Sequence, residues 1–390
     1  MAGVGRNLWL TAALLALFAL AAVLLRSTLW LCGVAALLCL AGVVLFRGER
    51  WRNIALLLAA LPVAAGILDV MAGWSAPPPH GADLVARIDP VVWVQPDPDV
   101  GYRPIPNIVV VATTTYGNQT IYRATYTIGP DGTRVSPPAP PGADLYLFMG
   151  DSFMFGQGLA DDQNLSAQFA RESDLKVRAV NFSAMGWAPN HLVRALEAGL
   201  LDRFKGDHVK AVVTWIIPDH MSRLTGDGEW LGSSPRYVLE DGKLEYTGSF
   251  THHRWMNPLA GLRYQAGKIF SFVNAIGMRQ RQVQQGELFD ALMLRLRALV
   301  REKFNAPLIV LYSWPDEGFA ASHPEGGEQL QLQVSVLARL RKQGFELLSV
   351  DGLTRNMDNS RVMIPYDGHP NAFANGLVAS ELKRRLRPAD

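Results

Sequence analysis

Cysteine is scarce in this chain, and neither sign of charge forms a long run. The 390 residues include two cysteines, Cys32 and Cys39, which lie in one apolar stretch. The rest of the chain therefore has no disulfide framework and must be held together by its core. Lysine and arginine number 37 against 35 acidic residues, which gives a formal net charge of +2. No basic stretch is interleaved with aromatic residues, so we do not expect nucleic acid as a partner.

Motifs for phosphate and metal chemistry are also missing. The chain contains no GxxxxGK[ST] phosphate loop and no His-Glu-x-x-His metal motif. His252 and His253 are adjacent and would point to opposite faces of a strand, which is typical of a solvent-exposed pair. The glycines of Gly156–Gly158 form only a fragment of a dinucleotide-binding loop. We therefore expect neither a metal nor a cofactor.

Charge is almost absent from three stretches near the N-terminus. The apolar runs are Leu8–Leu25, Thr28–Phe46 and Ile54–Gly73. Each is about long enough to cross a bilayer as a helix. A cleaved signal peptide is disfavoured because a second apolar run follows Arg26 at once. The sequence predicts a membrane domain with three transmembrane helices over residues 1–74.

The positive charges between these runs predict an orientation. The second loop carries Arg47, Arg50 and Arg52, whereas the first loop has only Arg26. Loops rich in arginine stay in the cytoplasm. The N-terminus is therefore expected in the cytoplasm, and everything after Gly73 outside the inner membrane, which in a bacterium is the periplasm. The spans are almost free of polar residues, which favours an anchor over a transport or assembly role.

Two proline clusters bound the next region. Trp74–Gly81 is a proline-rich connector, and Ser136–Gly142 is a second cluster. Between them, short β-branched and aromatic runs alternate with turn residues, as in strands. We expect a linker and a small β-rich region over 75–143.

From Asp144 onward, strand-like and helix-like segments alternate. This rhythm predicts a three-layer α/β sandwich, flavodoxin-like, in which helices cover both faces of a parallel sheet over 144–390. The stretch at about 223–304 breaks the rhythm and is interpreted as an insertion. It contains an expected hairpin around Asp241-Gly242.

A serine follows the first strand-like run of this region. Ligands of open parallel sheets bind at the carboxyl ends of the strands, where Ser152 of FMGDSFMFGQG is expected. A serine hydroxyl becomes a nucleophile when an oriented base takes its proton. Asp367 and His369 lie two residues apart just before the last helix-like segment, and a loop there could present both to Ser152.

These segments resemble the SGNH hydrolases, also called the GDSL lipase/acylhydrolase superfamily, from Asp144 to the C-terminus. The GDS at Gly150–Ser152 resembles the block that carries the nucleophile, here Ser152. NFSAMG resembles the second block, whose glycine, here Gly186, donates a backbone N–H to the oxyanion hole. DGHPN resembles the last block, with the base His369 and its partner Asp367. The resemblance implies acyl transfer through a Ser-His-Asp triad.

The third block departs from the family pattern. The family has an oxyanion-hole Asn after the central strand, but this chain has PDHMSR there. His220 could donate a hydrogen bond to an oxyanion, and an ionised Asp219 could not. Asn190 is another candidate donor.

The resemblance and the predicted spans together imply a membrane-anchored serine esterase. The expected substrates are small acyl esters, acetyl above all, plausibly carried by envelope or exopolysaccharide sugars. An O-acetyltransferase of the same fold and a non-catalytic glycan-binding module are the alternatives. The sequence indicates no protein partner.

Overall fold

The structure is a computed structural model and describes residues 28–45, 48–74, 84–226, 228–270, 273 and 278–386. It divides into two compact units. One unit comprises residues 1–79 and 257–278, and the other comprises residues 80–256 and 279–390.

The first unit is helical where it is described. Its main helices are α2 (Thr28–Leu45), α3 (Glu49–Trp74) and α9 (Pro258–Ile269). Within the described residues, one helix is long and apolar enough to cross a membrane, over Glu49–Asp69 of α3. The expectation of three such helices is corrected accordingly. The second predicted run forms α2 but is not among the candidate spans, and Leu8–Leu25 lies outside the described residues.

The second unit is built on a five-stranded sheet. Its strands are β6 (Leu145–Gly150), β7 (Arg178–Ser183), β8 (Val209–Ile216), β11 (Leu308–Tyr312) and β12 (Glu346–Ser349). The order is β12-β11-β8-β6-β7, and every neighbouring pair is parallel. The strand order reverses between β6 and β8, which is where ligands bind in sheets of this kind. The parallel α/β architecture expected from the sequence is confirmed.

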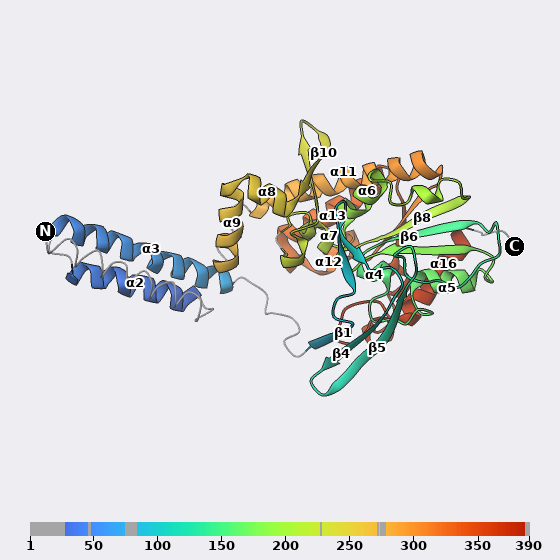
Figure 1. Ribbon diagram of the computed structural model, residues 1–390, viewed down its shortest axis with the longest axis horizontal. Coiled ribbons are helices and arrows are strands. Elements are labelled where there is room, and N and C mark those ends of the chain that lie inside the picture. The colour runs from blue at the N-terminus through green and yellow to red at the C-terminus, as the bar shows by residue number, and fades with distance from the viewer. Residues whose placement is uncertain are drawn as a thin grey trace. The chain divides into compact units, whose positions relative to one another are not determined.

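Side chains of β6 alternate between two cores, as buried central strands require. Leu145, Leu147 and Met149 face one core, whereas Tyr146 and Phe148 face the other. The first core is covered by α6 (Pro189–Glu197), α11 (Met278–Phe304) and α13 (Gly327–Lys342). The second is covered by α5 (Leu165–Glu172) and α16 (Ala372–Leu386). The helices therefore form a layer on each face of the sheet (Figure 1).

Shorter elements complete this unit. The short helices are α4 (Ser152–Phe155), α7 (Asp219–Arg223), α8 (Phe250–Met256), α12 (Glu317–Ser322), α14 (Val350–Thr354) and α15 (Asn359–Val362). Single 3-10 turns occupy Asp202–Phe204, Glu229–Leu231 and Pro324–Gly326.

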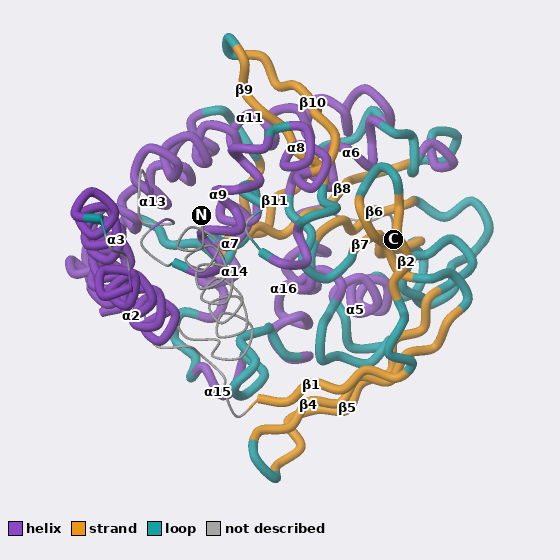
Figure 2. The backbone as a smooth tube through the Cα atoms, turned by 60° about the vertical axis from the view of Figure 1, so that its left-hand side comes forward, coloured by secondary structure: helices purple, strands orange, loops and turns teal. Residues whose placement is uncertain are grey.

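A separate antiparallel sheet precedes the main one. It consists of β1 (Leu84–Asp89), β4 (Ile108–Tyr116) and β5 (Gln119–Ile128) in the order β1-β4-β5. A small ribbon pairs β2 (Val94–Asp97) with β3 (Gly101–Pro104). The three-stranded sheet lies apart from the parallel sheet in Figure 2. Its core includes Trp93, Tyr126 and Phe155, and Phe155 belongs to α4. The predicted β-rich region is therefore packed against the turn that carries Ser152.

The segment predicted as an insertion contains both a hairpin and a core helix. Strands β9 (Pro235–Glu240) and β10 (Lys243–Ser249) form the hairpin expected around Asp241-Gly242. Asp241 and Gly242 have φ angles of 51° and 74°, the left-handed backbone that a tight hairpin turn requires. The part of α11 from Phe289 onward contributes Phe289, Leu292 and Leu296 to the first core. That part of α11 is an integral layer of the main fold.

Candidate active site

The turn after β6 holds Ser152 at the start of a short helix. Asp151 caps α4 by accepting a hydrogen bond from the N–H of Phe153 at 3.0 Å. Gly150 is required before it, because a Cβ there would lie 2.7 Å from the Cβ of Met154. Asn181 of β7 donates to the carbonyl of Met154 at 2.9 Å and so holds α4 to the neighbouring strand. The serine is thus fixed on a rigid strand-to-helix turn.

Ser152, His369 and Asp367 meet at this turn. The Nδ1–H of His369 donates to Oδ1 of Asp367, because a carboxylate can only accept. This tautomer leaves Nε2 as an acceptor, and it lies 2.8 Å from Oγ of Ser152, which donates to it. The ring of Phe153 lies 5.0 Å from the His369 ring and limits its movement. The arrangement is that of a serine nucleophile, a base and an orienting carboxylate.

The β4–β5 hairpin reaches the acid of this triad. Tyr122 on β5 lies close enough to Asp367 for the Asp367 charge, together with burial, to raise the pKa of Tyr122. Tyr116 of β4 stacks on Tyr366, with ring centroids 4.1 Å apart and planes 3° from parallel. The side chain of Asp367 is 4% exposed. The small sheet therefore forms part of the site's wall.

The loop after β7 brings Gly186 next to a tyrosine and a tryptophan. Gly186 has a φ of +84°, and a Cβ there would lie 2.7 Å from Oη of Tyr102 and 3.0 Å from Nε1 of Trp230. Tyr102 donates to the carbonyl of Met185 at 2.7 Å and holds the loop in place. Among the described turns, loops and caps, the N–H groups of Ser152 and Gly186 donate to no backbone carbonyl. This agrees with the predicted role of Gly186 as an oxyanion donor, which stays a prediction.

His220 is bound to the residue before Ser152. Its Nε2 donates to Oδ2 of Asp151 at 3.0 Å, because a carboxylate can only accept, and burial lowers the pKa of His220. Its Nδ1 is buried without a hydrogen-bond partner among the described residues. The Nε2–H is thus committed to Asp151, and the oxyanion role of His220 stays a prediction that this contact does not support.

Arg223 completes the surroundings of Asp151. Its Nη1 donates to Oδ2 of Asp151 at 3.0 Å and to the carbonyl of Trp187 at 2.7 Å. Burial alone would raise the pKa of Asp151, but His220, Arg223 and the N–H of Phe153 hold it well below its usual value. Asp151 is therefore an ionised, fully buried anchor that joins the serine turn, α7 and the Gly186 loop.

Asn190 also points elsewhere than expected. Its Nδ2 donates to the carbonyl of Pro235 at 2.7 Å, and the residue is 1% exposed. Its amide holds α6 to the β9–β10 hairpin, a contact that does not support its predicted oxyanion role. Asp219, the neighbour of His220, begins α7 and lines a cavity described below.

Arg134 fastens the small sheet to the serine turn. It is 2% exposed, and its Nη1 donates to the carbonyls of Phe155 and Gly156 at 2.6 and 2.8 Å. A third bond goes to the carbonyl of Leu159, and Nε pairs with Asp161 at 3.3 Å. Burial of this cation is compensated by a full set of acceptors.

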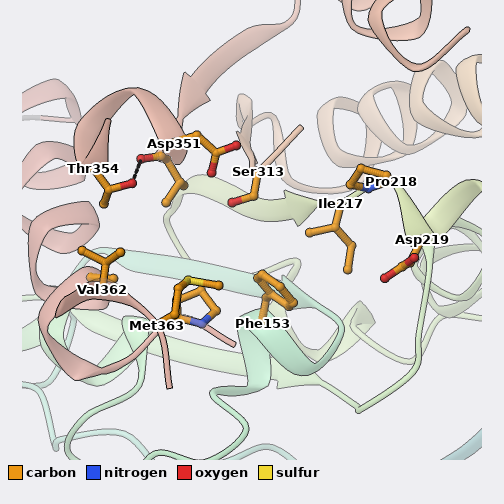
Figure 3. A pocket seen from close by; sticks show the side chains of 12 residues that line it. Phe153, Ile217, Pro218, Asp219, Ser313, Asp351, Thr354, Val362 and Met363 are labelled. Atoms are coloured by element: carbon orange, nitrogen blue, oxygen red, sulfur yellow. Dashed lines mark hydrogen bonds between the residues drawn. The ribbon is translucent and has the colours of Figure 1, made fainter. Parts of the chain in front are cut away.

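A small cavity opens beside the triad at the carboxyl ends of β8, β11 and β12. It has a volume of about 200 Å³. Phe153 and Met363 lie along one side of it, and Ser313 and Asp351 lie across from them (Figure 3). Burial raises the pKa of Asp351, and the neighbouring Ser313 and Trp314 oppose this rise. The cavity is mostly apolar, and its lining includes two acids, Asp219 and Asp351.

Several residues of the site carried no interpretable signal in the sequence. Tyr122 and Arg134 lie in the β-rich region, where the pattern predicts strands but no contact with the triad. Asp151 is adjacent to the predicted nucleophile, and its buried partners His220 and Arg223 share the PDHMSR segment that replaces the third block. The available signal for this network was the PDHMSR segment, which lacks the oxyanion-hole Asn of the family and carries a His and an Arg.

Comparisons with known proteins find distant structural similarity between this chain and several solved structures. No protein-family model matches the chain, and no curated protein is similar to it in sequence. Among solved structures, the acetylxylan esterase Axe2 from Geobacillus stearothermophilus is 13% identical, with 63% of this chain and 95% of that chain covered and a TM-score of 0.35.

Two further solved structures are similar to the same degree. LAE5, an alpha/beta hydrolase enzyme from the metagenome of Lake Arreo, is 15% identical, with coverages of 65% and 98% and a TM-score of 0.38. The lipase Lip_vut3 from a goat rumen metagenome is 12% identical, with coverages of 63% and 99% and a TM-score of 0.36. At these identities and TM-scores the likeness carries no weight for function, which follows from the geometry of the site.

Proposed function

We propose that this chain is a serine esterase, anchored in a membrane, that acts on small acyl esters and on acetyl esters above all. The observation that carries the proposal is the 2.8 Å hydrogen bond between Ser152 Oγ and His369 Nε2, with Nδ1 of the same ring held by Asp367. A binding module has no need of this relay, so the geometry favours an enzyme over the glycan-binding alternative.

The mechanism is a two-step acyl transfer. Ser152 Oγ attacks the ester carbonyl carbon while Nε2 of His369 takes the hydroxyl proton. The N–H groups of Ser152 and Gly186 hold the resulting oxyanion. The bond to the alcohol oxygen breaks, and the alcohol leaves with the proton from His369. Water then gives a proton to His369, attacks the acyl-serine and releases the acid, and the proton returns to Ser152.

The cavity beside Phe153 supports a small substrate group. Its volume of about 200 Å³ lies below the roughly 300–1,000 Å³ of pockets for drug-sized ligands. Phe153 directly follows Ser152, and Pro370, which also lines the cavity, directly follows His369. A short acyl chain is the group that fits next to the serine. The proposed natural carriers of that acyl group are envelope or exopolysaccharide sugars.

The ester series tests this function. The purified full-length chain in detergent should hydrolyse p-nitrophenyl acetate faster than the butyrate and octanoate esters, and Ser152→Ala should abolish hydrolysis of all three. Equal rates in Ser152→Ala and the unaltered chain, with both folded, would remove the esterase proposal. A preference for octanoate would remove the small-acyl part alone.

Membrane anchoring rests on α3. Only 17% of its apolar window is buried, unlike the core helix of a soluble protein, and Leu57 and Leu61 are 71% and 63% exposed.

We place the N-terminus in the cytoplasm and the triad in the periplasm, on the arginine bias of the loops. The exposed residue Ser360, replaced by Cys, should react with a membrane-impermeant maleimide in spheroplasts. Reaction only after the membrane is permeabilised would contradict this orientation.

A further inference from the structure

A long segment of this chain is free of acidic residues. Between Glu245 and Glu287 there is no aspartate or glutamate, whereas five arginines and lysines occur there. The whole chain has nearly equal numbers of acidic and basic residues, so this segment is a local excess of positive charge. Such a segment attracts a surface of negative charge.

The same segment exposes large apolar side chains in succession. At the end of α8, Trp255 and Met256 are 78% and 63% exposed. In the first turns of α9, Leu259 and Leu262 are 78% and 69% exposed. These are among the most exposed apolar residues of the described chain outside the apolar helix α3. Left in water, they would lose the free energy that burial gives side chains of this size.

Helix α9 has the pattern of a helix that lies at a membrane interface. Asn257 caps it by accepting from the N–H of Ala260 at 3.2 Å, and Pro258 occupies its first turn, so the start of the helix is well defined. Leu259 and Leu262 are three residues apart and share a face. Arg263 and Lys268 are exposed on the same short helix. Exposed leucines and exposed cations on a helix of low overall hydrophobicity are two of the features of interfacial helices.

The position of α9 in the fold points to the same partner. Although it is distant in sequence, α9 belongs to the compact unit that contains α2 and α3. That unit holds the candidate membrane span of the described chain. The candidate span and α9 therefore belong to one compact unit.

We propose that the interfacial segment, Asn257–Lys268, binds the headgroup region of a bilayer that carries anionic phospholipid. Leu259 and Leu262 enter the boundary between headgroups and acyl chains, and Arg263 and Lys268 pair with lipid phosphates. Each cation near an anionic surface adds to the attraction. This surface is distinct from the proposed esterase site and requires no catalytic residue.

The test measures the depth of a nitroxide label in the full-length chain. Cys32 and Cys39 are replaced by alanine, and Leu262→Cys carries the label. Phe319→Cys on α12, where the native residue is 47% exposed, is the matched control. The chain is reconstituted in vesicles of phosphatidylcholine with or without phosphatidylglycerol. Frequent collision of the nitroxide with oxygen shows that the label is in lipid, and frequent collision with a water-soluble nickel chelate shows that it is in water.

The expected result is a lipid signal at position 262 in vesicles with phosphatidylglycerol and a water signal at position 319 in both vesicles. Replacing Arg263 and Lys268 together by glutamine should lower the lipid-to-water ratio at position 262 by about 30-fold, from roughly 1 kcal/mol for each cation. Contact of position 262 with water in both kinds of vesicle would overturn the proposal, and so would equal insertion of the label without phosphatidylglycerol. Broadening of the spectrum by label–label contact that persists in detergent would also overturn it, because a second copy of the chain would then cover this segment. Hydrolysis is not measured, so failure here leaves the esterase proposal intact.

Discussion

His220 donates its Nε2 proton to Oδ2 of Asp151 across 3.0 Å, in the place where the resemblance implied an oxyanion donor. Asp151 is the residue before the proposed nucleophile and is fully buried. The histidine therefore supports the serine turn through its carboxylate partner. This makes His220 a positioning residue.

Substitution of His220 should separate a positioning role from a direct role in the chemistry. His220→Gln keeps an N–H within reach of Asp151 and should retain most activity, whereas His220→Ala leaves a buried carboxylate with one donor fewer. We expect His220→Ala to lower the free energy of unfolding by about 2 kcal/mol, in the range for hydrogen bonds to charged groups. Denaturant unfolding checks the stability, and ester hydrolysis checks the rate. If Gln and Ala variants were both inactive at native stability, His220 would have to act directly in the chemistry.

Gly186→Ala tests the oxyanion loop. The new methyl group would lie 2.7 Å from Oη of Tyr102, and its backbone φ of +84° disfavours any side chain. Displacement of the Gly186 N–H should lower kcat by about 100-fold or more, the usual effect of losing one oxyanion donor. Gly142→Ala is the matched control, because its φ is +77° and nothing lies within 4 Å of the added Cβ. It shares the backbone strain without the clash. Comparable kcat values in the two variants would exclude Gly186 from the oxyanion hole.

Tyr122→Phe tests the contribution of the small sheet to catalysis. The charge of Asp367, which orients His369, helps to raise the pKa of Tyr122, so the two side chains lie near each other. Removing a polar hydroxyl near the orienting carboxylate should lower kcat by about 10-fold and leave KM nearly unchanged. Tyr116→Phe keeps the ring that stacks on Tyr366 and should behave like the unaltered chain. An unchanged kcat in Tyr122→Phe would show that the hydroxyl does not help to position the triad.

The buried histidine His191 predicts a pH dependence of stability. Burial and the nearby Arg223 lower the pKa of His191 from 6.5 to about 3. Between these values the unfolded chain binds the proton and the folded chain does not, so the free energy of unfolding is complete above pH 6.5 and falls as pH drops. The expected loss is about 1 kcal/mol for each pH unit below that point.

Denaturant midpoints at a series of pH values check this slope. The indole of Trp187 stacks on the His191 ring with centroids 5.6 Å apart, so its fluorescence should report unfolding at this place. His191→Gln should flatten the slope between pH 6.5 and 3, and replacement of the exposed His252 by Gln should not. A slope that is the same in all three chains would assign it to other groups.

Arg134→Met tests the junction between the small sheet and the serine turn. Methionine fills much of the volume but leaves the carbonyls of Phe155 and Gly156 without their buried donor. Removing one member of a buried charged network lowers the free energy of unfolding by roughly 3–5 kcal/mol. Calorimetric or denaturant unfolding measures the loss. Arg203→Met, at a more exposed arginine that also lies over an aromatic ring, is the control and should stay within about 1 kcal/mol. Equal losses in both would contradict the structural role given to Arg134.

The sequence predicted the parts of this molecule that depend on local pattern. The run Leu145–Gly150 is apolar throughout because both faces of this strand are buried, and such a run predicts a central strand. The turn and the hairpin were predictable because single residues there favour the backbone angles that turns require. The segments that carry Ser152 and His369 were recognisable because each is a short motif next to a regular element. Their meeting at 2.8 Å follows from the edge at which parallel strands end.

The rest depends on contacts between distant segments, which no local pattern encodes. Tyr122 reaches Asp367 across 245 positions of the numbering, from a strand whose own alternation specifies only which face is buried. The commitment of His220 to Asp151 was hidden for the same reason, because its partner is 69 residues away. Of the three predicted spans, the described residues hold one candidate, over Glu49–Asp69, whereas Leu8–Leu25 lies outside them.

The most direct test of the account is covalent labelling of the serine. The full-length chain is treated with a fluorophosphonate, which phosphonylates activated serines, and the modified peptide is mapped by mass spectrometry. Labelling should be confined to Ser152, vanish in Ser152→Ala and slow by orders of magnitude in His369→Ala, because the base that activates Oγ is lost. A fully folded chain in which Ser152 is not labelled, or is labelled equally fast without His369, would contradict the proposal that this serine is the nucleophile of an esterase.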